Sequence, residues 1–506
     1  MTSKAKVLII GIDGLDAGLL SRFKGDLPNF AELMRKWASF RMHSVFPPDS
    51  PTAWASIFTG LNPAKHGIVS FKDPFSRSRV GDYFDKVQNI KGKTFWDFAG
   101  KYGKKCCIVF PHLAYPPWPV NGILVSRTTE VDIKKFDIKT YPAELALGCD
   151  PLELKPVTSF PRNIGEVIQP TKQLVLNEAE FGMRLFERSD WDVFFIYFSS
   201  LDNIEHIFWM ALDRRHPAYA EMNQYHETIS DFYGFYDQHV IGKFMKAAAS
   251  DAAIIVISDH GHGLRPLNLV RLNELLARSD LQKTKIKSRN LLDLNYLKEF
   301  AKKKMTDIIN ERRTVAKLAS RFLSMFPQSL GLYTGSSPID WSNTLAYLSD
   351  SSAGLKTYSY AGVRVKNDVE PLVYENIRKS IIEILKHIED PATSEKILEW
   401  AIRREELYDG PYISRYPDVV FKLKDDWGVD WGTGSSLFGK SITHKLFSGT
   451  HRQDSAVLLL HHPDGLRCRT DKPKLTDLTP TILQLLGLDD LDSYGPFDGR
   501  SIISSA

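Results

Sequence analysis

The stretch AAIIVISDHGHG (residues 252–263) passes from a strongly apolar segment straight into an aspartate–histidine pair. Its apolar part, 252–258, is too short for a typical helix and is apolar on both faces. This pattern is typical of a strand that is buried on both sides in a parallel sheet. Because ligands bind beyond the carboxyl ends of strands in open α/β sheets, Asp259 and His260 are candidate site residues.

Two other segments show the same arrangement. KVLIIGI (6–12) is followed by Asp13, and DVFFIYF (192–198) is followed by SSLDNIEH, which contains Asp202 and His206. A single aspartate after a strand is often only a helix cap or a turn residue. Three strands that each bring a carboxylate to the same edge of a sheet, two of them with a histidine, favour a common site.

The rest of the chain predicts a core with an insertion. Amphipathic stretches at 30–40 and 176–189 lie between the apolar segments, and this alternation predicts a doubly wound sheet covered by helices on both faces. Residues 265–440 differ in texture, with charged helical segments followed by strand-like pieces. We therefore expect a core made of residues 1–264 and 441–506, with 265–440 as a mainly helical insertion or cap.

Composition excludes several classes of protein. The chain has 506 residues, 43% hydrophobic and 25% charged, which is ordinary for a soluble globular protein. A net charge of +4 gives no reason to expect a nucleic acid polymer as partner. No apolar run approaches the roughly 20 residues of a membrane helix, so no transmembrane segment is expected. The sequence leaves the oligomeric state open.

The start of the chain and the cysteines favour a cytoplasmic location. MTSKAKVLII lacks both the apolar core and the cleavage site of a signal peptide, so none is expected. The four cysteines, none of them in a CxxC pair, fit a reducing compartment; they are Cys106, Cys107, Cys149 and Cys468.

The carboxylates and histidines are spaced to bind metal. Asp202 and His206 are four residues apart, so they share one face if DNIEH begins a helix. Asp259 and His260 are adjacent and can both reach a metal where the strand turns. Oxygen and imidazole ligands without thiolate suit zinc, manganese or iron. DxxxH alone is a weak signal, because a surface ion pair has the same spacing; SDHG after a buried strand is stronger.

A further ligand is expected late in the chain, around SGTHRQDSAVLLLHH (448–462). His451 precedes the apolar run 456–460, whose composition predicts another strand. On residue type alone the candidates are His444, His451, His461 and His462.

The stretch PPDSPTAWASIFTG (47–60) offers four hydroxyl groups, on Ser50, Thr52, Ser56 and Thr59. Serine before proline is a common N-cap, with the proline at the first helical position. The stretch by itself does not decide between a capped helix and a nucleophile.

Taken together, these motifs resemble a known family. VLIIGIDGLD, PPDSPTAWASIFTGLNPAKHGI, LDNIEH, SDHGHG, GTHR and LTPTILQLLGL…DGRSI follow one another from residue 7 to residue 502. They resemble the alkaline phosphatase superfamily, and within it the type I phosphodiesterase and nucleotide pyrophosphatase branch. The resemblance implies a three-layer αβα sandwich with a mostly parallel central sheet. It also implies two divalent metal ions, usually zinc, with manganese as the alternative.

The resemblance also implies two sets of ligands. One ion is expected at Asp13, Asp259 and His260 together with the nucleophile. The other ion is expected at three residues: Asp202, His206 and His451. Three carboxylates and one alkoxide then offset the charge of two divalent cations.

The family's spacing identifies the nucleophile. In this branch the reacting Thr or Ser lies four residues before the Trp of a motif like TxPAW and ten before the Gly of the following TG. Both counts lead to Ser50, from Trp54 and from Gly60. Thr52 is the alternative, at a position where the family often has Pro. A coordinated metal ion would lower the pKa of the hydroxyl, and the helix start would favour the alkoxide.

Two positions depart from the family's pattern. Nucleotide pyrophosphatases carry a phosphate-binding Asn shortly after HGI, where this chain has Phe71 and Lys72. Lys72 is a candidate substitute contact, and a solvated lysine is the alternative. His262, in DHGHG, stands where the family varies, and we interpret it as peripheral.

These features predict a two-metal phosphodiesterase that acts on a small-molecule phosphate ester through a phosphoseryl intermediate. A phosphomonoesterase is one alternative, although no equivalent of the extra Arg or third metal of such enzymes is evident. A phosphotransferase like the cofactor-independent phosphoglycerate mutases is another, and a catalytically silent metal- and phosphate-binding protein is a third. The sulfatase route through a modified cysteine is not supported, because PPDSPTAW contains no cysteine.

Overall fold

The computed structural model describes residues 6–71, 87–128, 136–157, 163–283, 339–351, 356–433, 436–490 and 495–504. The chain forms two compact units. The first comprises Met1–Ile68, Ser78–Gly263 and His451–Ala506, and the second comprises Val69–Arg77 and Leu264–Thr450.

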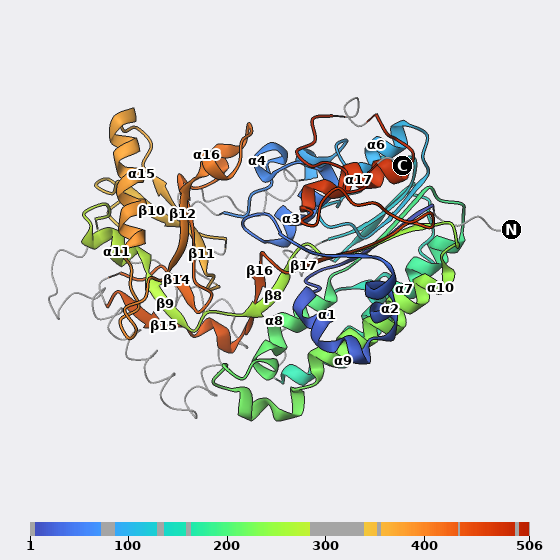
Figure 1. The fold of residues 1–506 in the computed structure, drawn as a ribbon, viewed down its shortest axis with the longest axis horizontal. Coiled ribbons are helices and arrows are strands. Elements are labelled where there is room, and N and C mark those ends of the chain that lie inside the picture. The colour runs from blue at the N-terminus through green and yellow to red at the C-terminus, as the bar shows by residue number, and fades with distance from the viewer. Residues whose placement is uncertain are drawn as a thin grey trace. The chain divides into compact units, whose positions relative to one another are not determined.

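The first unit is built on an eight-stranded, mostly parallel sheet (Figure 1). From edge to edge its strands are β2 (Ala38–Met42), β17 (Ala456–His461), β7 (Ala253–Ile257), β1 (Val7–Ile12), β6 (Val193–Phe198), β3 (Cys106–Val109), β4 (Gly122–Arg127) and β5 (Ile138–Tyr141). The pairings from β7 to β4 are parallel, whereas β2, β17 and β5 join the sheet antiparallel. The predicted α/β fold with a mostly parallel sheet is confirmed.

The three apolar segments that predicted the fold lie side by side at the centre of this sheet, in the order β7, β1, β6. Every residue of these strands is buried, as expected for strands covered on both faces. Their shared direction brings their carboxyl ends to one edge.

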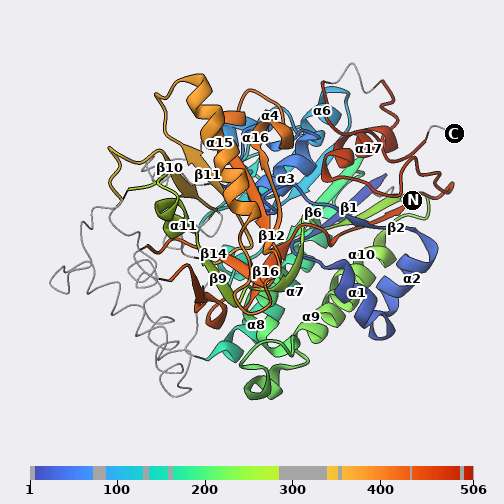
Figure 2. The same ribbon diagram turned by 60° about the vertical axis from the view of Figure 1, so that its left-hand side comes forward.

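Helices cover both faces of the sheet (Figures 1 and 2). On one face lie α3 (Ser50–Thr59), α4 (Pro63–His66), α6 (Phe95–Lys101) and α17 (Leu478–Leu485). On the other lie α1 (Ala17–Phe23), α2 (Pro28–Lys36), α7 (Ile168–Glu187), α8 (Ser200–Leu212), α9 (Thr228–Tyr236) and α10 (Gly242–Ala247). Alternate strand residues, such as Val7 and Ile9, pack with Trp54 and Phe58 of α3 in one apolar core.

Two local predictions differ from the structure. The amphipathic stretch 30–40 is helical only to Lys36, and its last residues belong to β2, where Phe40 pairs with Leu458. Strand pairing therefore overrides the helical pattern there. The N-cap of α3 is Asp49 and Ser50 is the first helical residue, one position earlier than the Ser-Pro pattern predicts.

The second unit has its own sheet and apolar core. Its four antiparallel strands are β10 (Ala346–Ser349), β11 (Tyr360–Val365), β13 (Val419–Leu423) and β12 (Leu398–Arg403), in that order. The helix α15 (Pro371–Lys386) lies along this sheet (Figure 2). A three-stranded sheet joins β14 (Trp427–Asp430), β9 (Asn268–Arg271) and β15 (Phe438–Lys440), followed by α11 (Leu272–Arg278) after β9. The charged segment 291–322, predicted to be helical, lies outside the described residues.

Among the helices in the described ranges, none has both the length and the apolar character that crossing a membrane requires.

Candidate metal centre

Three neighbouring strands deliver acidic side chains to the same edge of the central sheet. Asp13 follows β1, and Asp259 follows β7. Asp202 lies in the first turn of α8, which begins two residues after β6. Because β7, β1 and β6 are adjacent and parallel, these carboxylates converge as the sequence predicts.

The first group of ligands comprises Asp13, Asp259 and His260. All three are buried, and one ligand atom from each lies within 4.8 Å of the others. His260 Nε2 is 3.5 Å from Asp13 Oδ1 and 3.3 Å from Asp259 Oδ2. The other ring nitrogen, Nδ1, donates to the carbonyl oxygen of Gly261 at 3.2 Å, so Nε2 is the nitrogen that faces the group.

The Ser50 hydroxyl lies beside this first group. Its Oγ donates to Asp13 Oδ1 at 3.3 Å and is 3.2 Å from His260 Nε2. The other hydroxyls of the stretch are placed differently: Thr52 is fully buried, Ser56 Oγ is 2.9 Å from His66 Nε2, and Thr59 Oγ1 donates to the carbonyl of Ala55.

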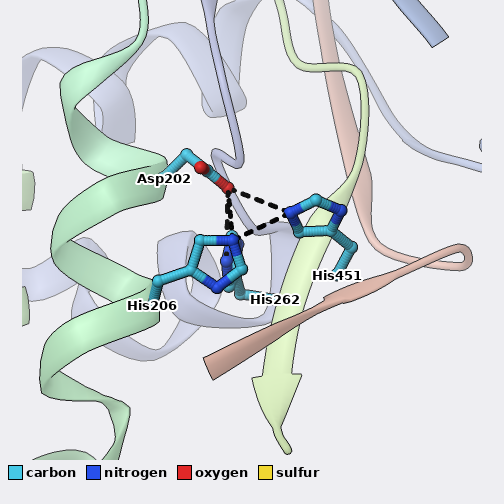
Figure 3. A group of neighbouring side chains, drawn as sticks. All are labelled: Asp202, His206, His262 and His451. Atoms are coloured by element: carbon cyan, nitrogen blue, oxygen red, sulfur yellow. Dashed lines mark hydrogen bonds and ion pairs between the residues drawn. The ribbon is translucent and has the colours of Figure 1, made fainter. Parts of the chain in front are cut away.

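The second group brings Asp202 together with three imidazole rings (Figure 3). Asp202 Oδ1 is 3.6 Å from His206 Nε2, 3.4 Å from His451 Nε2 and 3.3 Å from His262 Nε2. His206 Nε2 and His451 Nε2 are only 3.0 Å apart. The two groups are adjacent, because the rings of His260 and His451 stack with their centroids 3.8 Å apart.

His262, which the sequence interpretation placed at the periphery, lies inside this second group. It belongs to β8 (Gly261–Leu264), which pairs with β16 (Gly449–Arg452), the strand that carries His451. The spacing of DHGH contained a signal for this: residues two apart in an extended chain share a face, so His262 follows the side of His260.

The remaining sequence candidates lie elsewhere. His461 pairs with Ile254 near the start of β7, at the far end from His260, and its ring stacks on Trp37 at 4.9 Å. His462 is 3.8 Å from Asp464. His444 belongs to the second unit. Lys72 lies outside the described residues.

Hydrogen bonds from neighbouring residues orient the ligands. Trp54 Nε1, at 3.2 Å, and the Tyr197 hydroxyl both donate to Asp13 Oδ2, which leaves Oδ1 facing Ser50. His451 Nδ1 donates to the carbonyl of Pro48 at 2.9 Å, so its Nε2 faces Asp202. Such outer hydrogen bonds fix the orientation of metal-binding side chains.

The charge balance of the first group favours a cation. Burial, followed by the charges of Asp259 and Asp202, raises the pKa of Asp13 well above its ordinary value. Burial, and then Asp202, raises the pKa of Asp259 to about 8. These carboxylates oppose one another's ionisation, and a bound divalent cation relieves such repulsion.

In the second group the nearby imidazole rings favour the ionised form of the Asp202 carboxylate. Burial acts to raise the pKa of Asp202, but His206 and then His451 outweigh it and hold that pKa well below its ordinary value. Burial acts to lower the pKa of His451, but Asp202 and Asp49 outweigh it and raise that pKa to about 9.

The donor atoms fit divalent metal ions. Asp202 Oδ1 and Asp259 Oδ2 are buried and accept no hydrogen bond from the residues that the structure describes, although each faces imidazole nitrogen. Two facing ring nitrogens at 3.0 Å, as in His206 and His451, are also arranged as ligands of one ion would be. Carboxylate oxygen and imidazole without thiolate suit zinc or manganese.

Comparison with protein families agrees with this site. The family model described as type I phosphodiesterase / nucleotide pyrophosphatase matches residues 7–441. The chain belongs to this family. A search of the curated proteins finds no match. The type I phosphodiesterase / nucleotide pyrophosphatase family is a branch of the alkaline phosphatase superfamily, as the motifs predict, and membership implies a phosphoric ester hydrolase acting on small-molecule phosphate esters.

Proposed function

We propose that this member of the family is a two-metal phosphodiesterase that acts through a covalent phosphoseryl intermediate on Ser50. The observation that carries the proposal is the position of Ser50 Oγ. It contacts both Asp13 and His260, and the second ligand group lies next to His260. A divalent ion held by Asp13, Asp259 and His260 would lie beside this hydroxyl and would lower its pKa, which nothing does for an ordinary capping serine.

Each ion has a proposed set of ligands. Asp13, Asp259 and His260, with Ser50, would hold one ion. The other would be held by Asp202, His206 and His451. Zinc is the proposed metal, with manganese as the alternative. Bound ions supply Lewis acidity, which lowers the pKa of a coordinated hydroxyl and polarises the phosphoryl group.

The proposed reaction has two steps, transfer of the phosphoryl group to Ser50 and hydrolysis of the resulting intermediate. Ser50 Oγ attacks phosphorus, so that a new O–P bond forms and the bond to the leaving alcohol breaks. The intermediate is a phosphoseryl diester that keeps the second alcohol; water attacks its phosphorus, the Ser50 O–P bond breaks, Oγ regains a proton, and a phosphomonoester is released. Helix α3 begins at Ser50, so the positive end of its dipole lies beside the attacking hydroxyl and favours the phosphoryl oxygens.

We also propose that residues 265–440 act as the cap that selects the substrate. In support, the second unit has an apolar core of its own, which includes Val363, Ile381 and Phe421. A unit with its own core can vary independently of the catalytic sheet. The expected substrate is a small phosphate diester, because the sequence offers no equivalent of the extra charge-neutralising group of monoesterases.

A reducing, cytoplasmic compartment is part of the proposal. All four cysteines are unpaired, and Cys106 and Cys107 are buried within β3. Unpaired thiols are typical of proteins kept in reducing conditions.

The test is a chelation experiment combined with a substrate panel. EDTA should remove activity, and zinc or manganese should restore it. The panel compares bis-p-nitrophenyl phosphate, p-nitrophenyl phosphate, a nucleotide diester and 2- or 3-phosphoglycerate. Faster turnover of the diesters supports the proposal. Turnover of the monoester alone indicates a phosphomonoesterase, and interconversion of the phosphoglycerates indicates a phosphotransferase. Full activity after exhaustive chelation contradicts the two-metal site.

A further inference from the structure

A buried pair, Glu205 and His262, adjoins the second ligand group and has no part in the two ligand sets proposed above. Glu205 lies on α8, three residues after Asp202 and directly before His206, and its side chain is fully buried. His262 lies on β8, and its side chain is fully buried as well.

The imidazole of His262 lies between two carboxylates. Its Nδ1 is 2.8 Å from Glu205 Oε2, and its Nε2 is 3.3 Å from Asp202 Oδ1. Figure 3 shows the ring directed at the same carboxylate as the rings of His206 and His451. Its centroid lies 4.8 Å from that of His206 and 5.4 Å from that of His451.

Surrounding groups hold this pair in place. Glu205 Oε1 accepts a hydrogen bond from the Tyr233 hydroxyl at 2.8 Å. The same hydroxyl accepts one from the backbone N–H of Asp16 at 3.0 Å, and Asp16 Oδ2 in turn accepts from the backbone N–H of His262 at 3.1 Å. Trp209 stacks on the His262 ring, with centroids 6.0 Å apart.

The backbone at Gly14 passes close to the His262 ring. Gly14 has φ +74°, and a Cβ at that position would lie 3.0 Å from His262 Nδ1. A glycine there accommodates both the left-handed backbone and the imidazole.

The position of Glu205 decides which ring nitrogen can bind a metal. A carboxylate beside Nδ1 favours the proton on Nδ1, which leaves the Nε2 lone pair directed at the second group. Carboxylate–histidine–metal arrangements orient ligating histidines in this way. The opposite arrangement, an imidazolium between two carboxylates, would place a positive charge where the ion is expected.

We propose that His262 is a fourth protein ligand of the ion at Asp202, His206 and His451, and that Glu205 positions it. This inference rests on the proposed two-metal function and adds to the ligand set that the family motifs imply. Three imidazoles and one carboxylate fill the four positions of a tetrahedral zinc ion. Each ion would then have four protein ligands, because the first group comprises Asp13, Asp259 and His260 together with Ser50.

The direct test is a crystal structure of the zinc-loaded wild-type protein. We expect His262 Nε2 at about 2.0–2.1 Å from the zinc ion beside Asp202, the usual Zn–N distance. A His262 nitrogen more than about 3 Å from the zinc, beyond any Zn–N bond, overturns the proposal. This measurement needs no variant, so it decides the question even if the substitutions below fail to fold.

A second test measures zinc binding to the metal-free protein by calorimetry and by metal analysis. Glu205→Gln should weaken one of the two zinc sites by about 10–100-fold, the range found when ligand-orienting groups are removed. His262→Phe removes a ligand and should weaken the same site at least as much. His462→Phe is the matched control, since His462 is partly exposed beside Asp464. It should leave both affinities unchanged.

The outcomes separate this inference from the proposed function. If the wild-type protein binds no zinc at either group, the two-metal proposal itself fails. If it binds two ions and both affinities are the same in His262→Phe, the two-metal site stands and His262 is not a ligand.

Discussion

At the residue scale, the two carboxylate oxygens of Asp13 have different roles: one accepts hydrogen bonds that orient the side chain, and the other faces the candidate metal site. Its Oδ2 accepts hydrogen bonds from Trp54 Nε1 and from the Tyr197 hydroxyl. Its Oδ1 faces Ser50 and His260. Because Oδ2 is occupied, the carboxylate cannot rotate freely, and Oδ1 is held toward the first ligand group.

Replacing the Tyr197 hydroxyl should therefore weaken metal binding without changing a ligand. We expect Tyr197→Phe to lower zinc affinity at one site by about tenfold or more, because an outer hydrogen bond that orients a ligand is lost. Calorimetric titration of the metal-free protein measures this. Tyr115→Phe is the control, since it also removes a hydroxyl–carboxylate hydrogen bond, to Asp137. Equal effects of the two substitutions would rule out the orienting role.

The choice of nucleophile is also a residue-scale question. We expect Ser50→Ala to reduce kcat by roughly 10⁴-fold or more, as loss of a catalytic nucleophile does, while the bound metal content stays close to that of the wild type. Thr52→Ala should retain most of the activity. Phosphodiesterase assays together with metal analysis measure both effects. An active Ser50→Ala enzyme combined with an inactive Thr52→Ala enzyme would transfer the role to Thr52.

At the scale of an element, α3 joins the candidate nucleophile to the core. Pro51 fixes the first turn, and every residue from Thr52 to Thr59 is buried. The helix ends at Gly60, whose φ of +67° allows its N–H to bond the carbonyl of Ser56. A helix so completely buried holds Ser50 in a fixed position.

Ending α3 with a glycine should matter for stability. In Gly60→Ala a Cβ would lie 3.0 Å from Phe497 and 3.2 Å from Thr479, in addition to the strain of a left-handed backbone. We expect a cost of about 2–4 kcal/mol, from roughly 1–2 for the backbone and about 1–2 for overpacking. Gly103→Ala isolates the backbone cost, because Gly103 has φ +76° and open space at its Cβ. Thermal unfolding compares the two, and equal shifts would mean that the packing cost is absent.

Residues far apart in sequence are tied together at the scale of the whole molecule. In the second unit, the buried guanidinium of Arg265 donates to the carbonyls of Thr357, Phe447 and Gly449 at 2.8, 2.6 and 2.7 Å. The guanidinium carbon also lies over the Tyr358 ring, 5.3 Å from the ring centroid. One side chain thus joins three segments of the chain that the sequence separates by up to 184 positions.

Removing this side chain should destabilise the second unit. We expect Arg265→Met to cost several kcal/mol, since each buried carbonyl left unpaired costs about 1–3 kcal/mol. Hydrogen exchange should show the loss of protection concentrated in residues of the second unit. Arg278→Met is the control, because Arg278 is half exposed and paired with Glu274 one turn away, a pair worth under about 1 kcal/mol. Uniform loss of protection over both units would contradict the expectation.

Much of the fold and of the candidate site follows from local sequence pattern. The apolar segments at 6–12, 192–198 and 252–258 are the central strands β1, β6 and β7. The acidic residues after them meet because parallel strands end at one edge of a sheet. DNIEH lies in α8, so Asp202 and His206 share one face as their spacing indicates. These features depend only on periodicity and strand direction, which a short stretch of sequence determines.

Other features depend on contacts that local pattern does not encode. The structure places His451 beside Asp202, 249 positions away, whereas His461 lies on Trp37. The fold also places His262 in the second group, where it pairs with Glu205, and it places Trp54 where its indole N–H bonds Asp13. The sequence by itself determined the three central strands and the acidic residues that follow them. The tertiary structure alone decided which side chains meet, because the order of strands and the packing of helices set those distances.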